Sequence, residues 1–372
     1  MVPYLPNEVV ALNPHVIPDM PIKPLKRISP SKYFAVDPCI LREAWAANHI
    51  NELLPVIPTV RVGIIAHRIL ELTIKGRIRN HQDIDEIWKD GIKKFELEMH
   101  ENWMEKHLVP LARNAWNYEV KKQKCILLAQ NFFTNTEKAS GKGQKYEAEI
   151  WLETPDGKVG GKIDAIKQLG NDIQLIDYKT GKVFDKNQEG KVIKFEYQKQ
   201  LKLYAAMYYM NRGKWPTCLT IVELSQKEHD IPFHRDECME LLNDAVIRLE
   251  AIKQKISGIN YIDEIAYPSP QNCKYCYYWP GCAMYWEHKQ DSDKWPADCH
   301  GIVKEKRILG NGTLLLVLGR QEGDVVVSGL SMDRHGILKD DIREIYLYNL
   351  ERTPVPGYFK QGILTTCYKS CK

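Results

Sequence analysis

A short hairpin-like stretch constrains this chain more than any other feature. Residues 160–179 read as two strands joined at Gly170-Asn171. This dipeptide permits the positive φ angles of a two-residue turn. Folding the chain at this turn places Asp164 opposite Asp177, because both lie equally far from its centre. Lys179 lies two residues beyond Asp177 and therefore shares its face of the predicted sheet.

An acidic pair in this position needs a counter-charge. Residues directly across a ladder have Cβ atoms about 4.5 to 5.5 Å apart, and like charges there are destabilising. A divalent cation with oxygen ligands would offset the repulsion and could activate a phosphate group. Lys179 beside it would orient a water nucleophile and offset the negative charge that develops at phosphorus. The alternative is an exposed hairpin with a solvated acidic pair and a surface lysine.

Further motifs surround the hairpin in the order found in a known family. Gly161-x-Ile-Asp164 followed by Ile176-Asp-Tyr-Lys-Thr-Gly181 resembles the core of the RecB-like PD-(D/E)XK nucleases. Gln200-Leu-x-x-Tyr204 is similar to the next motif of that family, and Gly63-x-x-x-His67-x-x-Leu-Glu71 to its upstream histidine motif. The resemblance covers residues 29–282. The family members that it points to include CRISPR-associated and phage exonucleases.

The resemblance implies a role for each of these residues. Asp164, Asp177 and the carbonyl of Tyr178 would hold Mg²⁺ or Mn²⁺, and His67 would assist at the metal. Lys179 would orient the attacking water. Gln200 and Tyr204, four residues apart on one helix, would position the lysine and the scissile phosphate. Glu149 would be an auxiliary acidic residue near the metal, with a plain exposed glutamate as the alternative.

Three closely spaced cysteines form a second candidate site. Cys273-x2-Cys276-x5-Cys282 lies in a loop rich in aromatic residues, and Cys39 is the candidate for a fourth ligand. This spacing suits a thiolate cage for zinc or for an iron-sulfur cluster and does not distinguish the two. The resemblance to the iron-sulfur subgroup implies a [4Fe-4S] cluster, with zinc as the alternative. Such a cluster would close a long loop and stabilise the fold.

The other cysteines are not closely spaced in a pattern typical of metal ligands. We expect Cys218 to be a small core residue, and the remaining ones are Cys125, Cys238, Cys299, Cys367 and Cys371.

The remaining patterns predict an α/β fold with a mixed central sheet flanked by helices, a restriction-endonuclease-like core. Residues 1–28 are rich in proline and read as an extended arm. Residues 29–290 read as the nuclease domain, with a helical insertion over 83–140 whose Trp88, Trp103 and Trp116 are expected in the core. Residues 297–372 read as a small barrel-like β module, with an OB-fold as one candidate.

Individual elements follow from periodicity and turn signals. Ser29-Pro30 is a helix start, and Gly213 a helix end. Residues 182–194 read as a charged, flexible connection, and residues 340–344 as one helical turn. Helices are expected over 40–50, 61–72, 195–211 and 236–256, and strands over 146–154 and 217–224.

Composition adds weaker limits. A chain of 372 residues with 44% hydrophobic residues can build a large core, and a net charge of +4 does not by itself imply nucleic acid. No stretch reaches the length of a membrane span, and a cytoplasmic location is expected. The expected partner is single-stranded DNA. The chain has no phosphate-loop motif, so a helicase would be a separate protein, as would a recombination or CRISPR component.

Two other classes of function remain open at this point. A non-catalytic nucleic-acid-binding subunit could keep the same fold, but it would be expected to lack an active-site residue, and none of the expected set is missing. A zinc-stabilised structural protein would use the cysteines without nuclease chemistry.

Overall fold

The computed structural model describes residues 22–36, 38–139, 144–185 and 192–370. At its centre lies a five-stranded sheet in the order β1-β2-β3-β4-β5. The pairing of β3 with β4 is parallel and the other pairings are antiparallel, which confirms the predicted mixed sheet. The strands are β1 Gln144–Glu153, β2 Gly160–Leu169, β3 Asp172–Lys179, β4 Cys218–Glu223 and β5 Glu228–Asp230.

The turn between β2 and β3 has the predicted position. Gly170 has a φ of 61°, a conformation that glycine adopts without steric cost. The register runs from Leu169 opposite Asp172 to Ala165 opposite Ile176. Regular pairing stops one step before Asp164 and Asp177, so the predicted direct pairing of these two residues is not part of the ladder.

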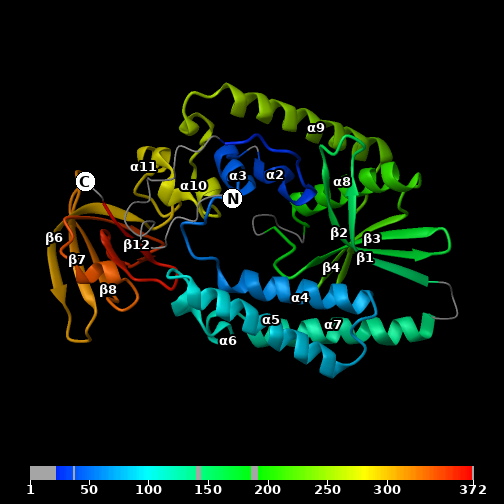
Figure 1. The fold of residues 1–372 in the computed structure, drawn as a ribbon, viewed down its shortest axis with the longest axis horizontal. Helices are drawn as coiled ribbons and strands as arrows, with labels where there is room; N and C mark the ends of the chain where they lie inside the picture. The colour runs from blue at the N-terminus through cyan, green and yellow to red at the C-terminus, as the bar shows by residue number, and fades with distance from the viewer. Residues whose placement is uncertain (1–21, 37, 140–143, 186–191, 371–372) are drawn as a thin grey trace.

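Helices cover both faces of this sheet (Figure 1). On one face, Ile176 and Tyr178 of β3 pack in a core with α4, α5 and α7. On the other, Leu175 and Leu219 pack in a core with α2, α3, α8 and α9. Both faces of β3 are therefore buried over residues 175–178. The helices are α2 Tyr33–Val36, α3 Ile40–Ala47, α4 Pro58–Ile74, α5 His81–Glu101, α6 Leu111–Asn114, α7 Tyr118–Ala139, α8 Phe195–Arg212 and α9 Arg235–Gly258.

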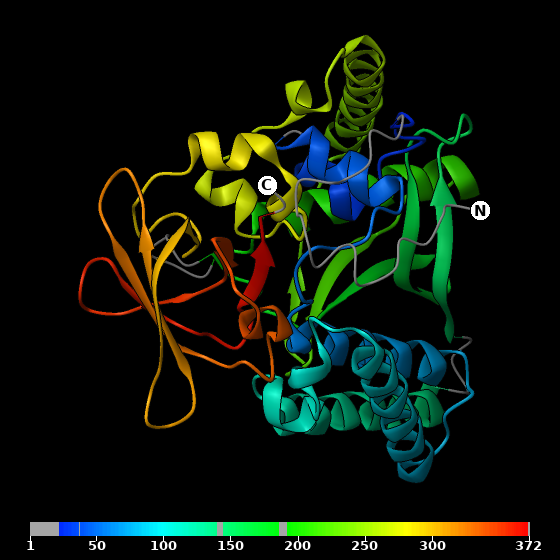
Figure 2. The same ribbon diagram turned by 60° about the vertical axis from the view of Figure 1, so that its left-hand side comes forward.

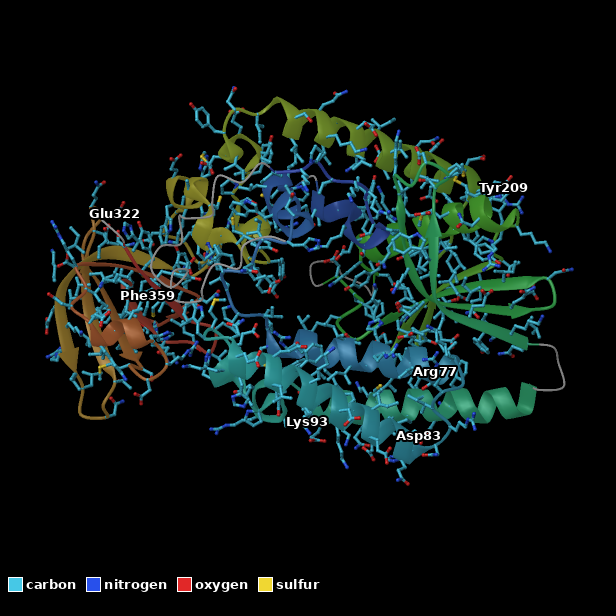
Figure 3. All side chains as sticks on the ribbon, viewed as in Figure 1. Arg77, Asp83, Lys93, Tyr209, Glu322 and Phe359 are labelled. Atoms are coloured by element: carbon cyan, nitrogen blue, oxygen red, sulfur yellow. The ribbon has the colours of Figure 1, made fainter. Side chains whose placement is uncertain are left out.

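The longer helices follow their local signals. Asn80 caps α5 by accepting a hydrogen bond from Asp83 N at 2.9 Å, and Gly213 ends α8 with a φ of 68°, as predicted. Figure 3 shows Asp83 and Lys93 on the outer side of α5, away from the sheet. Short helices fill the connections: η1 Pro30–Lys32, η2 Lys106–Leu108, η3 Ile262–Ile265, α10 Pro270–Cys273, η4 Trp279–Gly281, α11 Ala283–His288 and η5 Gly336–Lys339.

The C-terminal part forms a curled seven-stranded sheet (Figure 2). Its order is β10-β11-β8-β7-β6-β9-β12, and an apolar cluster that includes Phe359 fills its interior. The OB-fold assignment of this module stays a prediction. The strands are β6 Cys299–Ile308, β7 Leu314–Gly319, β8 Val325–Leu330, β9 Glu344–Tyr348, β10 Glu351–Arg352, β11 Tyr358–Lys360 and β12 Thr366–Lys369.

This second sheet is joined to the first part by shared core residues. Tyr348 of β9 and Tyr368 of β12 are fully buried in the same cluster as α3 and α8. The Tyr368 hydroxyl donates a hydrogen bond to Leu53 O at 2.6 Å, in the segment before α4. The two parts of the chain therefore pack through a common apolar interior.

Several expectations need correction. Residues 340–344 do not form a helical turn: η5 ends at Lys339, and β9 begins at Glu344 because Ile345 and Leu347 alternate into the core. Trp116 is 68% exposed and lies outside the core. Trp88 is buried in the core between the sheet and α4, and Trp103 is partly buried against the core on the other face of the sheet. The short strand β5 was not predicted.

Cys218 also differs from its expectation. It is half-buried at the start of β4, and its sulfur lies 3.3 Å from Thr220 Oγ1 and from Asp230 Oδ1, so its neighbours are polar. Parts of several predictions lie outside the described residues: residues 1–21 of the arm over 1–28, residues 186–191 of the connection over 182–194, residue 140 of the helical insertion, and residues 371–372 of the C-terminal module, which include Cys371. The part of the arm that is described packs on the body, with Leu25 and Ile28 buried.

Within the described residues, no helix combines the length and the apolar character needed to cross a membrane.

Replacing Gly161 by alanine should destabilise the fold. A Cβ at this position in β2 would lie 2.9 Å from Pro30 Cδ and 3.0 Å from the Tyr204 hydroxyl. Overpacking of this kind costs about 1 to 3 kcal/mol. We expect Gly161→Ala to lower the free energy of unfolding in urea by that amount. Gly258→Ala is the control, because its Cβ would meet nothing within 4 Å. Equal stabilities of the two variants would contradict the packing argument.

Candidate active site and cysteine cluster

Asp177 lies at the end of β3 and is the most buried acidic group of the site, with 3% of its surface exposed. The Lys179 ammonium lies 2.6 Å from its Oδ2, and Gln200 Nε2 donates a hydrogen bond to its Oδ1 at 3.0 Å. Lys179 Nζ also donates to Gln200 Oε1 at 3.0 Å. The three side chains form a closed triangle in which α8 supplies the amide and β3 the two charges.

Asp164 lies beside this triangle at the point where the β2–β3 ladder stops. The last regular pair is Ala165 with Ile176, so the backbone N–H of Tyr178 is not used in that ladder. Instead it donates to Asp164 Oδ2 at 2.7 Å. A side chain thus satisfies a buried backbone donor and is itself held in place.

Helix α4 brings His67 to the same point. His67 Nδ1 lies 3.5 Å from Asp164 Oδ2. One turn earlier, a Cβ on Gly63 would lie 2.9 Å from Thr180 Oγ1, just beyond β3. The absence of a side chain at Gly63 therefore lets α4 approach the strand end closely enough for His67 to reach Asp164. Glu71, one turn after His67 on α4, forms ion pairs with Arg68 and Lys75, both at 2.6 Å.

Tyr204 and Glu149 border the site from two sides. The buried Tyr204 hydroxyl donates to Lys162 O at 2.6 Å, so Tyr204 fixes the backbone of β2 next to Asp164. Glu149 has a φ of 54° and is left out of the regular β1–β2 register, at the position facing Asp164. Its Oε2 lies 3.7 Å from Lys162 Nζ. A non-glycine residue in this conformation costs free energy, and such strain is concentrated at functional sites.

Burial and neighbouring charges set the electrostatics of the site. Burial raises the pKa of Asp177 to about 6; the Lys179 ammonium counteracts this rise, and the Asp164 carboxylate adds to it. Burial also raises the pKa of Glu149, helped by the nearby charge of Asp164. For His67, burial lowers the pKa, but the contact with Asp164 outweighs it, so the pKa lies above its usual value.

Two contacts near Lys179 were missed by sequence reasoning. The Lys179 ammonium lies 4.3 Å from the centre of the Tyr197 ring, and Lys121 Nζ donates to Thr180 O at 2.6 Å. Tyr197 precedes Gln200 by three residues on α8, a helical spacing that could have indicated a shared face. Lys121 comes from α7, and no local pattern links it to β3.

The donor set suits a hard divalent cation. Asp177 Oδ2 is buried and, within the described part of the chain, accepts no hydrogen bond of regular geometry, although the Lys179 ammonium is close. Carboxylate oxygens are the ligands that Mg²⁺ and Mn²⁺ prefer. Across the described residues, no three His, Cys, Asp or Glu side chains are arranged tightly enough to enclose an ion. The roles of Asp164, Asp177, Tyr178 and His67 as metal ligands therefore stay predictions.

The four predicted cysteines lie near one another, because Cys39 adds to the rise in the pKa of the other three thiols, but within the described residues no three of them are arranged tightly enough to enclose an ion. Cys273, Cys276 and Cys282 are buried in the main core, and Cys39 packs against it. The segments around Cys39 and Cys273 are tied together by Asn272, whose Nδ2 donates to Pro38 O at 2.6 Å and whose carbonyl accepts from Arg42 at 3.2 Å.

The sulfur environment of this cysteine cluster has one feature that suits a thiolate. The backbone N–H of Tyr278 donates to Cys276 Sγ at 3.4 Å. Without a metal, burial raises the pKa of Cys273 to about 11 and that of Cys282 to about 12, and the neighbouring Cys39 adds to both. The free thiols are therefore protonated at neutral pH, and a bound metal would have to displace their protons.

Comparison with known proteins gives a family for most of the chain. A family model described as the PD-(D/E)XK nuclease superfamily matches residues 27–283, a range that contains all the site residues above. No curated protein matches the chain. Among solved structures, protein VC1899 from Vibrio cholerae is similar at 11% identity and a TM-score of 0.19, with 66% of this chain and 67% of that chain covered. A likeness at this level carries no argument about function.

The affinity for Mn²⁺ should depend on pH through Asp177. Its pKa of about 6 means that the carboxyl group is protonated below that pH and must lose its proton before it can bind a cation. We expect the Mn²⁺ affinity, measured by titration calorimetry, to rise by up to about tenfold per unit from pH 5 to 6 and to level off above pH 7. Asp177→Asn should abolish binding, while Asp172→Asn, at the exposed start of the same strand, should not. A flat pH profile would contradict the assignment.

Proposed function

We propose that this chain, which belongs to the PD-(D/E)XK nuclease superfamily, is a divalent-metal-dependent deoxyribonuclease that hydrolyses phosphodiester bonds from single-stranded ends. The observation that carries the proposal is the triangle of Asp177, Lys179 and Gln200 beside Asp164. It lies within the matched residues and combines buried oxygen ligands with a held ammonium group. Membership of the superfamily makes the chain a nuclease; the DNA preference, the exonuclease mode and the RecB-like subgroup are our inference.

The metal would be held by Asp164, Asp177, the carbonyl of Tyr178 and His67. A bound Mg²⁺ or Mn²⁺ ion would polarise the phosphate and make a bound water more acidic. His67, at 3.5 Å from Asp164, would steady that carboxylate or act as a further ligand. Glu149, in its strained conformation facing Asp164, would add negative charge near the ion.

Lys179 is the residue that acts on the reacting atoms. Its side chain is only 16% exposed, and Gln200 Oε1 and the Tyr197 ring contact its ammonium group from two sides. Held this way, it would orient the attacking water and stabilise the charge that develops on the phosphate oxygens. Gln200 is a positioning residue, because it bonds both Lys179 and Asp177. Tyr204 acts further away, through the backbone of β2.

The decisive test is cleavage of 5′- and 3′-labelled single- and double-stranded oligonucleotides with Mg²⁺ or Mn²⁺. Asp177→Asn and Lys179→Met should each lower the rate by about 100-fold or more, because each removes charge stabilisation of the transition state. Lys182→Met, an exposed lysine just beyond β3, should retain wild-type activity. Equal cleavage by all four proteins would end the proposal, and so would cleavage that is unaffected by chelating the metal.

We further propose that the four cysteines hold a [4Fe-4S] cluster, with zinc as the alternative. The support is their common location and the N–H donor to Cys276. The cluster would link the segment before α3 to the loop after α9 and so stabilise the domain rather than take part in hydrolysis. We also propose that a separate helicase, or a recombination or CRISPR component, supplies the single strands.

Metal analysis of protein purified without oxygen tests the cluster. We expect visible absorption, together with iron and acid-labile sulfide in equal amounts. Cys276→Ser should lose the colour and unfold at a lower temperature, while Cys218→Ala, at a half-buried position in β4, should keep both. Stoichiometric zinc in a colourless protein would instead support the alternative.

A further inference from the structure

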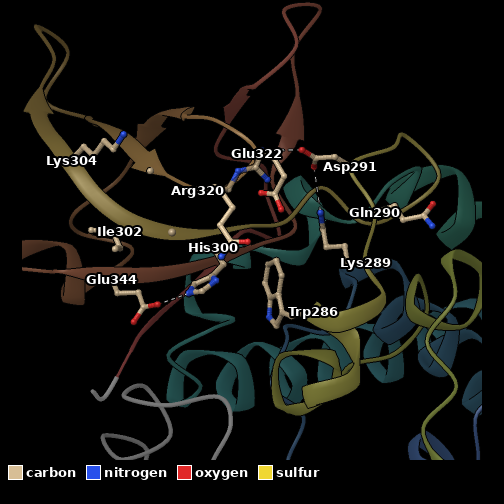
Figure 4. A pocket seen from close by; sticks show the side chains of 13 residues that line it. Trp286, Lys289, Gln290, Asp291, His300, Ile302, Lys304, Arg320, Glu322 and Glu344 are labelled. Carbon is tan, nitrogen blue, oxygen red and sulfur yellow. Dashed lines mark hydrogen bonds and ion pairs between the residues drawn. The ribbon is translucent and has the colours of Figure 1, made fainter.

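A cavity lies away from Asp177, where α11 and the loop after it meet the C-terminal sheet (Figure 4). Its volume of about 840 Å³ is within the range of small-molecule sites. Its lining begins at Trp286 and reaches β6, β7 and β9, so all of it follows residue 283, where the family match ends. The proposed hydrolysis gives it no role.

Two aromatic rings form one wall of this cavity. Trp286 is half-buried, and its ring centre lies 5.7 Å from that of His300. Both rings are held at their polar edges: Trp286 Nε1 donates to the Tyr348 hydroxyl at 3.1 Å, and His300 Nε2 lies 2.7 Å from Glu344 Oε1. His300 also stacks on Tyr346, with ring centres 3.9 Å apart. The planes of Trp286 and His300 are inclined at 56°, so a planar ring could stack on Trp286 with its edge toward His300.

Two cations lie on another side of the cavity. The Arg320 guanidinium contacts Asp291 at 2.8 Å, and Lys289 Nζ lies 3.7 Å from the same carboxylate. The Lys289 side chain is 5% exposed and that of Arg320 is 15% exposed. Figure 4 shows both side chains directed toward Asp291, with Glu322 beside Arg320.

Arg320 is incompletely satisfied. Arg320 Nε is buried, and the described residues offer it no hydrogen-bond partner. A second acid near Lys289, the buried Asp298, is already held by the Tyr285 hydroxyl at 2.5 Å and by Asn349 N at 2.7 Å. Both cations share the half-exposed carboxylate of Asp291, and Glu322 adds a second negative charge near Arg320. An anionic group in the cavity would supply a further acceptor for Arg320 and Lys289.

We propose that this cavity binds a nucleotide unit, with its base against Trp286 and His300 and its phosphate held by Arg320 and Lys289. A rigid aromatic wall facing two poorly solvated cations matches the two halves of a nucleotide. The amides of Gln290 and Gln321, which also line the cavity, can bond the edges of a base. The nucleotide is either free or part of a single strand. This binding does not depend on the chemistry at Asp177.

Binding is measured on the full chain carrying Asp177→Asn, with chelator present so that no cleavage occurs. Titration calorimetry compares the affinities for dAMP and deoxyadenosine and so measures the contribution of the phosphate. Fluorescence anisotropy with a labelled oligonucleotide measures the affinity for a single strand. Trp286→Leu should weaken binding by about 5- to 150-fold. Arg320→Met should remove the preference for dAMP over deoxyadenosine. Tyr358→Leu and Lys360→Met, on the exposed face of β11, are the matched controls and should bind normally.

The outcomes distinguish a free nucleotide from a single strand as the ligand, and they distinguish a failure of this binding proposal from a failure of the nuclease proposal. Trp286- and Arg320-dependent binding of dAMP identifies a free-nucleotide site, and the same dependence for the oligonucleotide alone identifies a strand site. Unchanged binding of both ligands in folded Trp286→Leu and Arg320→Met proteins overturns the proposal, as does a lack of any binding of either ligand to the parent protein. With Asp177 intact, both variants should hydrolyse bis(p-nitrophenyl) phosphate at the normal rate, so a failure here leaves the nuclease proposal standing.

Discussion

A carboxylate with almost no access to water is the constraint on which the site depends. An ionised group in the interior costs several kcal/mol unless opposite charge and hydrogen bonds surround it. At Asp177 this requirement is met by Lys179 from the same strand and by Gln200 from α8. Because the amide of Gln200 bonds both charges, the position of α8 on the sheet is coupled to the geometry of the charged pair. A shift of α8 on the sheet would therefore also change the contacts within the charged pair.

The second carboxylate shows how an interrupted ladder can be used. Regular pairing between β2 and β3 ends just before Asp164, which frees a backbone donor at Tyr178. Asp164 satisfies that donor with one oxygen and lies next to His67 from the opposite helical layer. The two layers therefore meet at the end of β3, and Gly63 sets how closely they approach. Oxygen ligands, an imidazole and an ammonium group are brought together by elements from both faces of the sheet.

Local chemistry made part of this arrangement predictable. The Gly170-Asn171 turn set the register of β2 and β3, and the spacing of Asp177 and Lys179 set their common face. The contact of Gln200 with Lys179 could be expected only from the family resemblance, and its bond to Asp177 was not predicted, because both depend on how α8 packs. The left-handed backbone of Glu149 and the contact of Lys121 with Thr180 have no local signal at all. Trp116 was misplaced because helical periodicity marks an apolar stripe without showing what covers it.

The hydrogen bond from Tyr368 to the carbonyl of Leu53 has a consequence for biosynthesis. Translation proceeds from the N-terminus, so the segment around Leu53 leaves the ribosome long before Tyr348 and Tyr368, which complete the same apolar interior. Until β9 and β12 emerge, the nascent polypeptide has an unfilled gap in its core. A nuclease built this way can close this interior only after a residue 315 positions downstream of Leu53 has been made.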